Sequence, residues 1–77
     1  MEPGKEKELN QKGLALLQEG RPEEAILYFN QVIDTGGHNQ IKGWFNKGLA
    51  LKELGKLDES VECFDRALYL ENKINHT

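Results

Sequence analysis

The feature that most constrains this chain is an internal repeat, because the five residues Lys12–Leu16 (KGLAL) recur as Lys47–Leu51. The offset is 35 positions, counted from Gly13 to Gly48, and it is kept by further pairs: Gly20 and Gly55, Glu24 and Glu59, Phe29 and Phe64, and the small residues Ala25 and Ser60. A period of this length is typical of stacked supersecondary units that cannot bury their apolar faces alone. The chain is therefore one structural unit present twice. At 77 residues it is expected to form a single small domain over 1–77.

Apolar residues recur with the 3.6-residue period of an α-helix throughout both units, and no segment alternates with the period of a strand. The spacing predicts a helix from near Lys5 to Gly20 and three more at about Pro22–Asp34, Gln40–Leu54 and Leu57–Leu70. The polar tail Glu71–Thr77 is expected to be loose. The sequence thus predicts an all-α chain of four antiparallel helices, with the first unit at about 5–37 and the second at about 39–72.

Glycine, proline and asparagine mark the helix ends. Gly20 and Gly55 stand where a left-handed residue would end the first and third helices, and Pro22 suits a first helical turn. Asn39 is expected to cap the third helix through its side chain.

Two further glycines lie inside the helical patterns. Gly13 and Gly48 each cost about 1 kcal/mol relative to alanine at these positions. We expect them to make room for Phe29 and Phe64, respectively.

The second helix is apolar over most of its circumference, whereas a helix packed on one side shows a single apolar band. One stripe contains Ala25, Tyr28, Phe29 and Val32, and a second contains Ile26 and Ile33. Two apolar stripes indicate that this helix packs against two neighbouring helices. We therefore expect the second helix to pack between the first and the third, and the third to pack on the fourth.

These residues resemble the tetratricopeptide repeat, a helix–turn–helix unit with the pattern W-x2-L-G-x2-Y, then A-x3-F, then P. The second unit shows Trp44-x2-Lys47-Gly48-x2-Leu51 and Ser60-x3-Phe64, and the first shows Leu9-x2-Lys12-Gly13-x2-Leu16 and Ala25-x3-Phe29. Lysine replaces leucine before both glycines, leucine replaces tyrosine, Leu9 replaces tryptophan, and the closing proline is missing from both units. The resemblance covers about residues 6 to 72.

The resemblance implies two hairpins stacked as a short right-handed α-solenoid, in which the first helix of each hairpin lines a concave groove. It implies a non-enzymatic protein-interaction module or scaffold that binds a partner protein or peptide, and the groove lysines favour an acidic one. The groove residues would be Lys7, Asn10, Gln11, Leu14, Lys42, Phe45, Asn46, Leu49 and Lys52. The alternative is that these side chains are merely solvated outer positions of two helices and bind no partner. Relatives that clamp a C-terminal carboxylate use five lysine, asparagine and arginine side chains, of which only Asn46 has a counterpart here.

The fourth helix carries apolar residues at the positions that Pro22, Ile26 and Ile33 occupy on the second. These residues have no following helix in this chain to cover them, and natural arrays cover such a face with a polar capping helix. We therefore expect a homo-dimer or higher oligomer through Leu57, Val61 and Leu68. A purely structural oligomerisation module, or an excerpt of a longer array with no ligand of its own, is the alternative to a partner-binding protein.

Charge and composition argue against other classes of protein. The net charge of −3 comes from 10 basic and 13 acidic residues of interspersed sign, so neither nucleic acid nor a membrane is an expected partner. With one cysteine and no apolar leader, we expect a soluble cytoplasmic protein.

The sequence shows no convincing catalytic or metal-binding group. His38, His76 and Asp34 make a poor metal site, and Gly36 and Gly37 lack the lysine of a phosphate loop. Cys63 lies near Glu62 and Asp65, which oppose its ionisation. We expect no enzyme activity, no cofactor and no metal.

Overall fold

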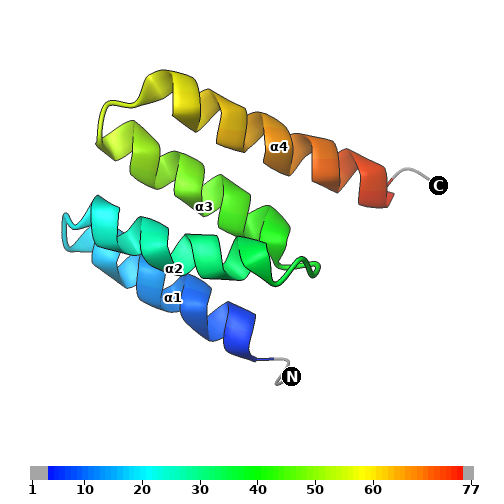
Figure 1. Cartoon of the computed structure of the whole chain (residues 1–77), viewed down its shortest axis with the longest axis horizontal. Coiled ribbons are helices and arrows are strands. Elements are labelled where there is room, and N and C mark those ends of the chain that lie inside the picture. The colour runs from blue at the N-terminus through cyan, green and yellow to red at the C-terminus, as the bar shows by residue number, and fades with distance from the viewer. Residues whose placement is uncertain (1–3, 76–77) are drawn as a thin grey trace.

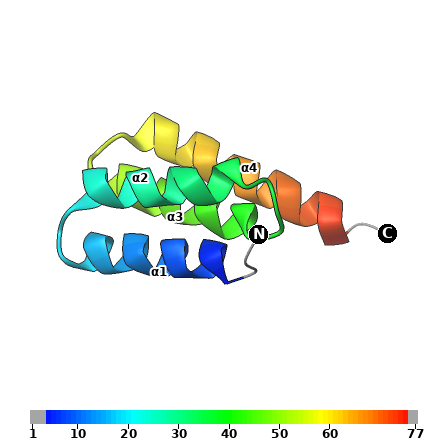
Figure 2. The same ribbon diagram turned by 60° about the horizontal axis from the view of Figure 1, so that its bottom comes forward.

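The four expected helices are present in the computed structural model, which describes residues 4–75. They are α1 (Lys5–Gln18), α2 (Pro22–Asp34), α3 (Gln40–Glu53) and α4 (Leu57–Asn75). Figure 1 shows them side by side in chain order, as two helical hairpins joined by the α2–α3 connection. The packed pairs are α1 with α2, α2 with α3 and α3 with α4, as the sequence predicts, and α1 also touches α3 (Figure 2). The all-α hairpin architecture is confirmed.

The shape of the stack leaves every helix with a solvent face. Its principal extents are 38 × 30 × 16 Å, and the shortest is not much more than the diameter of about 10–12 Å of a helix with its side chains. The core is accordingly narrow, with Phe29 and Val32 as its largest fully buried side chains. The other buried apolar residues are Leu9, Ala25, Ala50, Leu51, Cys63 and Ala67.

The turn inside each hairpin has the same hydrogen bonds in both repeats. Gly20 and Gly55 both have φ +78°, the left-handed conformation that favours glycine. Arg21 N donates to Leu16 O at 2.9 Å, and Lys56 N donates to Leu51 O at 2.9 Å. Together with the bonds from the two glycine amides, these form a Schellman motif at each helix end. The predicted glycine caps are confirmed.

One predicted helix start is confirmed in position but not in its hydrogen bond, and one predicted helix end is wrong. Asn39 stands at the N-cap position of α3, but its side chain makes no capping bond, and its Nδ2 donates instead to Glu6 Oε2 at 3.3 Å. The expected loose tail is wrong for residues 71–75, because α4 continues to Asn75. No glycine or proline follows Leu70 to stop the helix, and five helical residues more cost little once a helix has been nucleated. The rest of the predicted tail lies outside the described residues.

The glycines inside α1 and α3 allow close helix packing. A Cβ atom on Gly48 would lie 2.7 Å from Phe64 Cε1, and one on Gly13 would overlap the ring of Phe29. Both predicted glycine–phenylalanine contacts are therefore confirmed. Gly43, which the sequence pattern did not single out, has the same role between α3 and α2.

Candidate functional site

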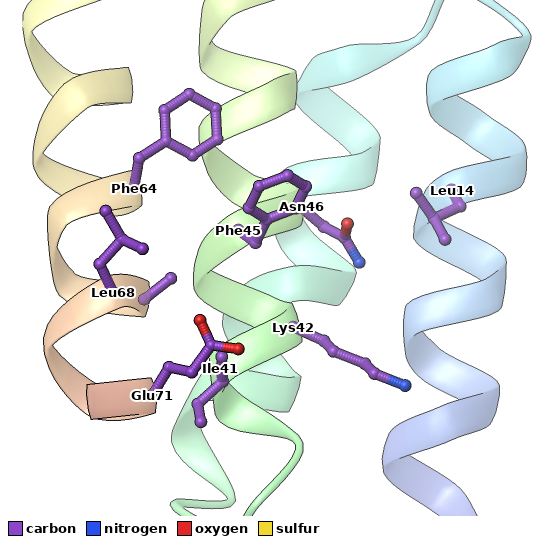
Figure 3. A pocket seen from close by; sticks show the side chains of 9 residues that line it. Leu14, Ile41, Lys42, Phe45, Asn46, Phe64, Leu68 and Glu71 are labelled. Carbon is purple, nitrogen blue, oxygen red and sulfur yellow. The ribbon is translucent and has the colours of Figure 1, made fainter. Parts of the chain in front are cut away.

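A hollow of about 480 Å³ opens on one face of the stack, between α3 and α4 and facing α1. Figure 3 shows its lining side chains arriving from three helices, with α3 in the middle. The repeat positions these side chains, because α3 and α4 are the two helices of the second hairpin. The lining residues are Leu14 from α1, Ile41, Lys42, Phe45 and Asn46 from α3, and Phe64, Ala67, Leu68 and Glu71 from α4.

The wall of the hollow is apolar and partly exposed. The rings of Phe45 and Phe64 touch in a tilted arrangement, with centroids 5.3 Å apart and planes at 52°. Phe45 is 50% exposed and Leu68 is 55% exposed. Two large apolar side chains that stay half exposed around one concave surface can gain free energy when another molecule covers them.

The charged groups near the hollow are open to a ligand. Lys42 and Glu71 stand on its rim (Figure 3), and both are exposed. The ion pairs of the described chain involve Lys12 with Glu8 and Arg21 with Glu19 and Glu24. Within residues 4–73, no carboxylate lies within 4.0 Å of the Lys42 ammonium group. Lys42 can therefore pair with a carboxylate of a bound molecule without breaking an existing pair.

A buried amide pair joins α1 to α3 beneath the hollow. Asn46 Nδ2 donates to Asn10 Oδ1 at 3.3 Å, and both side chains are buried. Asn10 Nδ2 has no hydrogen-bond partner among the described residues and is shielded from solvent. Burying an unpaired amide group costs free energy, so this pair is a weak point of the α1–α3 contact.

The structure divides the nine groove residues expected from the sequence into three groups. Leu14, Lys42, Phe45 and Asn46 line the hollow. Leu49 and Lys52 line a second, shallower hollow of about 300 Å³ together with Leu17, Gln18 and Glu53. Lys7 and Gln11 are exposed on α1, whereas Asn10 is buried against Asn46.

Sequence reasoning misses the contribution of α4 to the hollow. It predicts Phe64 only as the partner of Gly48, Leu68 only as an apolar residue awaiting cover, and Glu71 as part of a loose tail. The helical period of α4 joins them, since residues 64, 68 and 71 follow each other by four and three positions on one helix face. Continuing that period past Leu70 is the signal that could have found them.

The apolar stripe of α4, defined as Leu57, Val61 and Leu68, is exposed as expected. Leu57 is 60% exposed and Val61 is 55% exposed. Leu68 belongs both to this α4 stripe and to the hollow. The exposure is a finding, whereas the role of the α4 stripe in self-association stays a prediction.

A third hollow, of about 330 Å³, is lined by Trp44 and Cys63 among other residues. Lys47 Nζ and Arg66 Cζ each lie 5.7 Å from the centre of the Trp44 ring, so two cations flank the indole. Cys63 is buried in the same region, and burial raises the pKa of its thiol; Lys47 lowers that pKa, and Glu59 and Glu62 raise it. The expectation of a weakly nucleophilic thiol agrees with this direction, but burial is the main cause.

The described residues offer neither a metal-binding cluster nor a membrane span. His38 is exposed in the α2–α3 connection, and His76 lies outside the described residues. No cluster of three or more histidine, cysteine, aspartate or glutamate side chains in this part of the chain could hold a metal ion. Nor does any described helix combine the length and the apolar character needed to cross a membrane.

Comparison with known proteins agrees with the repeat seen in the fold. Models of the tetratricopeptide repeat match residues 9–35 and residues 41–73. Over 65 residues the chain is 40% identical to an uncharacterized protein of Methanocaldococcus jannaschii, and the match covers 84% of this chain and 74% of that protein. No solved structure matches the chain. Tetratricopeptide repeats generally mediate protein–protein interactions. The chain therefore belongs to the tetratricopeptide repeat family, with two repeats in tandem.

Proposed function

We propose that this protein binds a partner protein through the hollow between α3 and α4. The ligand is a peptide segment that carries one large apolar side chain beside acidic residues. The observation that carries the proposal is the combination, on one concave surface, of a half-exposed Phe45 with an exposed Lys42 that forms no ion pair within residues 4–73. The protein acts by binding alone and needs no catalytic group.

The large apolar side chain of the peptide supplies most of the affinity in this proposal. Fully burying a leucine or phenylalanine side chain is worth about 1.5–3 kcal/mol, so covering the exposed halves of Phe45 and Leu68 contributes about 1 kcal/mol each. An exposed ion pair with Lys42 adds about 0.2–1 kcal/mol. The charge therefore selects among apolar peptides and does not bind a peptide by itself.

A random peptide library displayed on phage tests the proposal even though the partner is unidentified. Selection on the full chain is expected to enrich peptides with an aromatic or large aliphatic residue flanked by Asp or Glu. Calorimetry then measures the selected peptides on two variants, Phe45→Ala and Lys42→Glu. Trp44 fluorescence is a poor reporter here, because Trp44 lines a different hollow.

The matched control is Lys56→Glu, which makes the same charge change in the exposed turn between α3 and α4, away from the hollow. We expect about a fivefold loss of affinity for Phe45→Ala, which corresponds to about 1 kcal/mol, a smaller loss for Lys42→Glu and wild-type affinity for the control. Equal binding by all four proteins would show that the selected peptides bind elsewhere and would contradict the proposal.

Self-association is the second candidate function, favoured by the exposure of the α4 stripe. Light scattering on a sizing column measures the mass at tens of micromolar. Val61→Glu tests the α4 stripe without touching the hollow, and Leu27→Glu is its matched control, since Leu27 is 61% exposed on α2. A dimer that only Val61→Glu dissociates would support this function. A monomeric wild-type protein would exclude it under those conditions.

A further inference from the structure

The contact between α2 and α3 shows how a helix is seated on the second helix of a repeat. The face that α3 turns to α2 carries two small residues seven positions apart, Gly43 and Ala50, and both are buried. A Cβ atom on Gly43 would lie 3.1 Å from Val32 Cγ1 and from Ile33 Cγ1. Ala50 packs in the core cluster with Ala25 and Phe29. The two small residues thus allow α3 to approach α2 closely.

The repeat places a matching surface on α4. At the offset of 35, Val61 and Leu68 stand where Ile26 and Ile33 stand on α2. Ile26 and Ile33 are partly buried, whereas Val61 and Leu68 are exposed in the described chain. The difference follows from α3, which packs against α2, whereas none of the described helices packs on the outer side of α4 (Figure 1). Two of the three residues of the α4 stripe therefore stand at the repeat positions on which α3 packs in the first repeat.

A second copy of this chain does not fit that geometry through its own α1. The counterparts of Gly43 and Ala50 on α1 are Glu8 and Ala15, and both are exposed. Stacking α1 of one copy on α4 of another would place the Glu8 side chain against Leu68, at the level where the α2–α3 contact has a glycine and even a Cβ atom would lie only 3.1 Å from Ile33 Cγ1. Such a contact buries a charge without a partner and adds bulk at the closest approach.

The charge of α4 disfavours pairing with α4 of a second copy as well. Between Leu57 and Lys73, α4 carries five acidic residues and two basic ones, a net charge of −3. Asp58, Asp65 and Glu71 are exposed next to the α4 stripe, and none of them forms an ion pair within residues 4–73. Two such helices repel each other, whereas a helix with Lys or Arg beside its apolar face is attracted.

We propose that the α4 stripe docks a basic amphipathic helix of a partner protein, which carries two small residues seven positions apart and lies on α4 as α3 lies on α2. This surface lies beside the hollow proposed for peptide binding and shares only Leu68 with it. Binding at the α4 stripe does not depend on the peptide-binding function.

The chain itself contains a suitable probe, since residues 38–55 include the helix that packs on the matching face of α2. This segment has three lysines and one glutamate, so it is basic, and it carries Gly43 and Ala50. A fluorescently labelled synthetic peptide of residues 38–55 is titrated with the full chain, and binding is followed by anisotropy. Amide chemical shifts of the 15N-labelled chain locate the contact.

We expect the peptide to bind and to shift amides along the outer face of α4. Its Gly43→Leu version and a peptide of residues 4–20, the α1 segment, are expected to bind at least tenfold more weakly. Val61→Glu in the chain is expected to weaken binding by a similar factor, whereas its matched control Leu27→Glu and the hollow variant Lys42→Glu leave binding unchanged. Circular dichroism confirms that the variants fold.

Three results would overturn the proposal. One is no binding of the 38–55 peptide to a monomeric chain. Another is equal binding of the Gly43→Leu peptide, since the docking would then not have the geometry of the α2–α3 contact. The last is a homodimer whose amides along α4 are protected and which Val61→Glu dissociates, because a second copy would then be the occupant.

Discussion

Replacing Gly13 or Gly48 by alanine tests whether the close helix packing sets the stability of the two repeats. Alanine gains about 1 kcal/mol over glycine inside a helix. The new methyl group also overlaps a phenylalanine ring, and this overlap opposes the gain, because overpacking a core costs about 1–3 kcal/mol. The two repeats differ in how far that ring can move.

The ring of Phe29 is fully buried, so it cannot move away from a methyl group on Gly13. Phe64 is only partly buried and faces the open hollow, so its ring can yield to a methyl group on Gly48. We therefore expect Gly13→Ala to lower the free energy of unfolding by about 2 kcal/mol and Gly48→Ala to be nearly neutral. For a domain of this size, about 1 kcal/mol corresponds to roughly 4–8 °C in Tm.

The assay is urea unfolding of each variant, followed by circular dichroism of the helices. Ala15→Gly, at an exposed position inside α1, measures how much glycine costs relative to alanine where no packing changes. It is expected to lower the free energy of unfolding by about 1 kcal/mol. If Gly13→Ala is as stable as the wild type or more stable, propensity outweighs packing, and the account of the glycine–phenylalanine contact is wrong. Equal losses in the two alanine variants would show that the exposure of the ring does not matter.

Further predictions concern Asn46, Ser60 and Cys63. Asn46→Ala leaves Asn10 without its buried amide partner and should cost about 1–3 kcal/mol, whereas replacing both asparagines by leucine should cost much less in the same urea assay. Ser60→Ala removes the 2.8 Å bond from Ser60 Oγ to Gly48 O and should cost about 1 kcal/mol; a larger loss would show that the hydroxyl also supports packing. Burial raises the pKa of the Cys63 thiol, so iodoacetamide at pH 8 should modify the folded chain more slowly than the urea-unfolded chain. The folded state then binds the thiol proton more tightly than the unfolded state, so the free energy of unfolding should fall as the pH rises above about 8.5.

Most of the architecture could be predicted from local patterns. The 35-residue offset defined two units, and Gly20 and Gly55 defined the helix ends, because only a glycine readily adopts a left-handed cap. The pairing of helices followed from the two apolar stripes of the second helix. The end of α4 could not be predicted in this way, since a polar sequence without glycine or proline is compatible with either a helix or a loose tail.

The candidate site was predicted only in part. Phe45, Lys42, Asn46 and Leu14 are among the groove residues that the resemblance to the tetratricopeptide repeat implies, and they line the hollow. Asn10 follows the same pattern, but it is buried because α1 and α3 meet at that level and its amide pairs with Asn46. Sequence spacing places a residue on a helix face, and it does not tell how closely the next helix approaches that face.

By itself the sequence determined where the helices lie apart from the end of α4, where the hairpins turn and that the unit occurs twice, since these depend on contacts between residues close along the chain. Only the tertiary structure decided that Phe64, Leu68 and Glu71 join Phe45 in one hollow. The structure also gives the degree of exposure of the α4 stripe, 55–60%, whereas the equivalent side of α2 is covered by α3, as the repeat predicted. The physical reason is that side-chain exposure depends on which helices lie next to each other, and the same residue pattern is partly buried on α2 and open to solvent on α4.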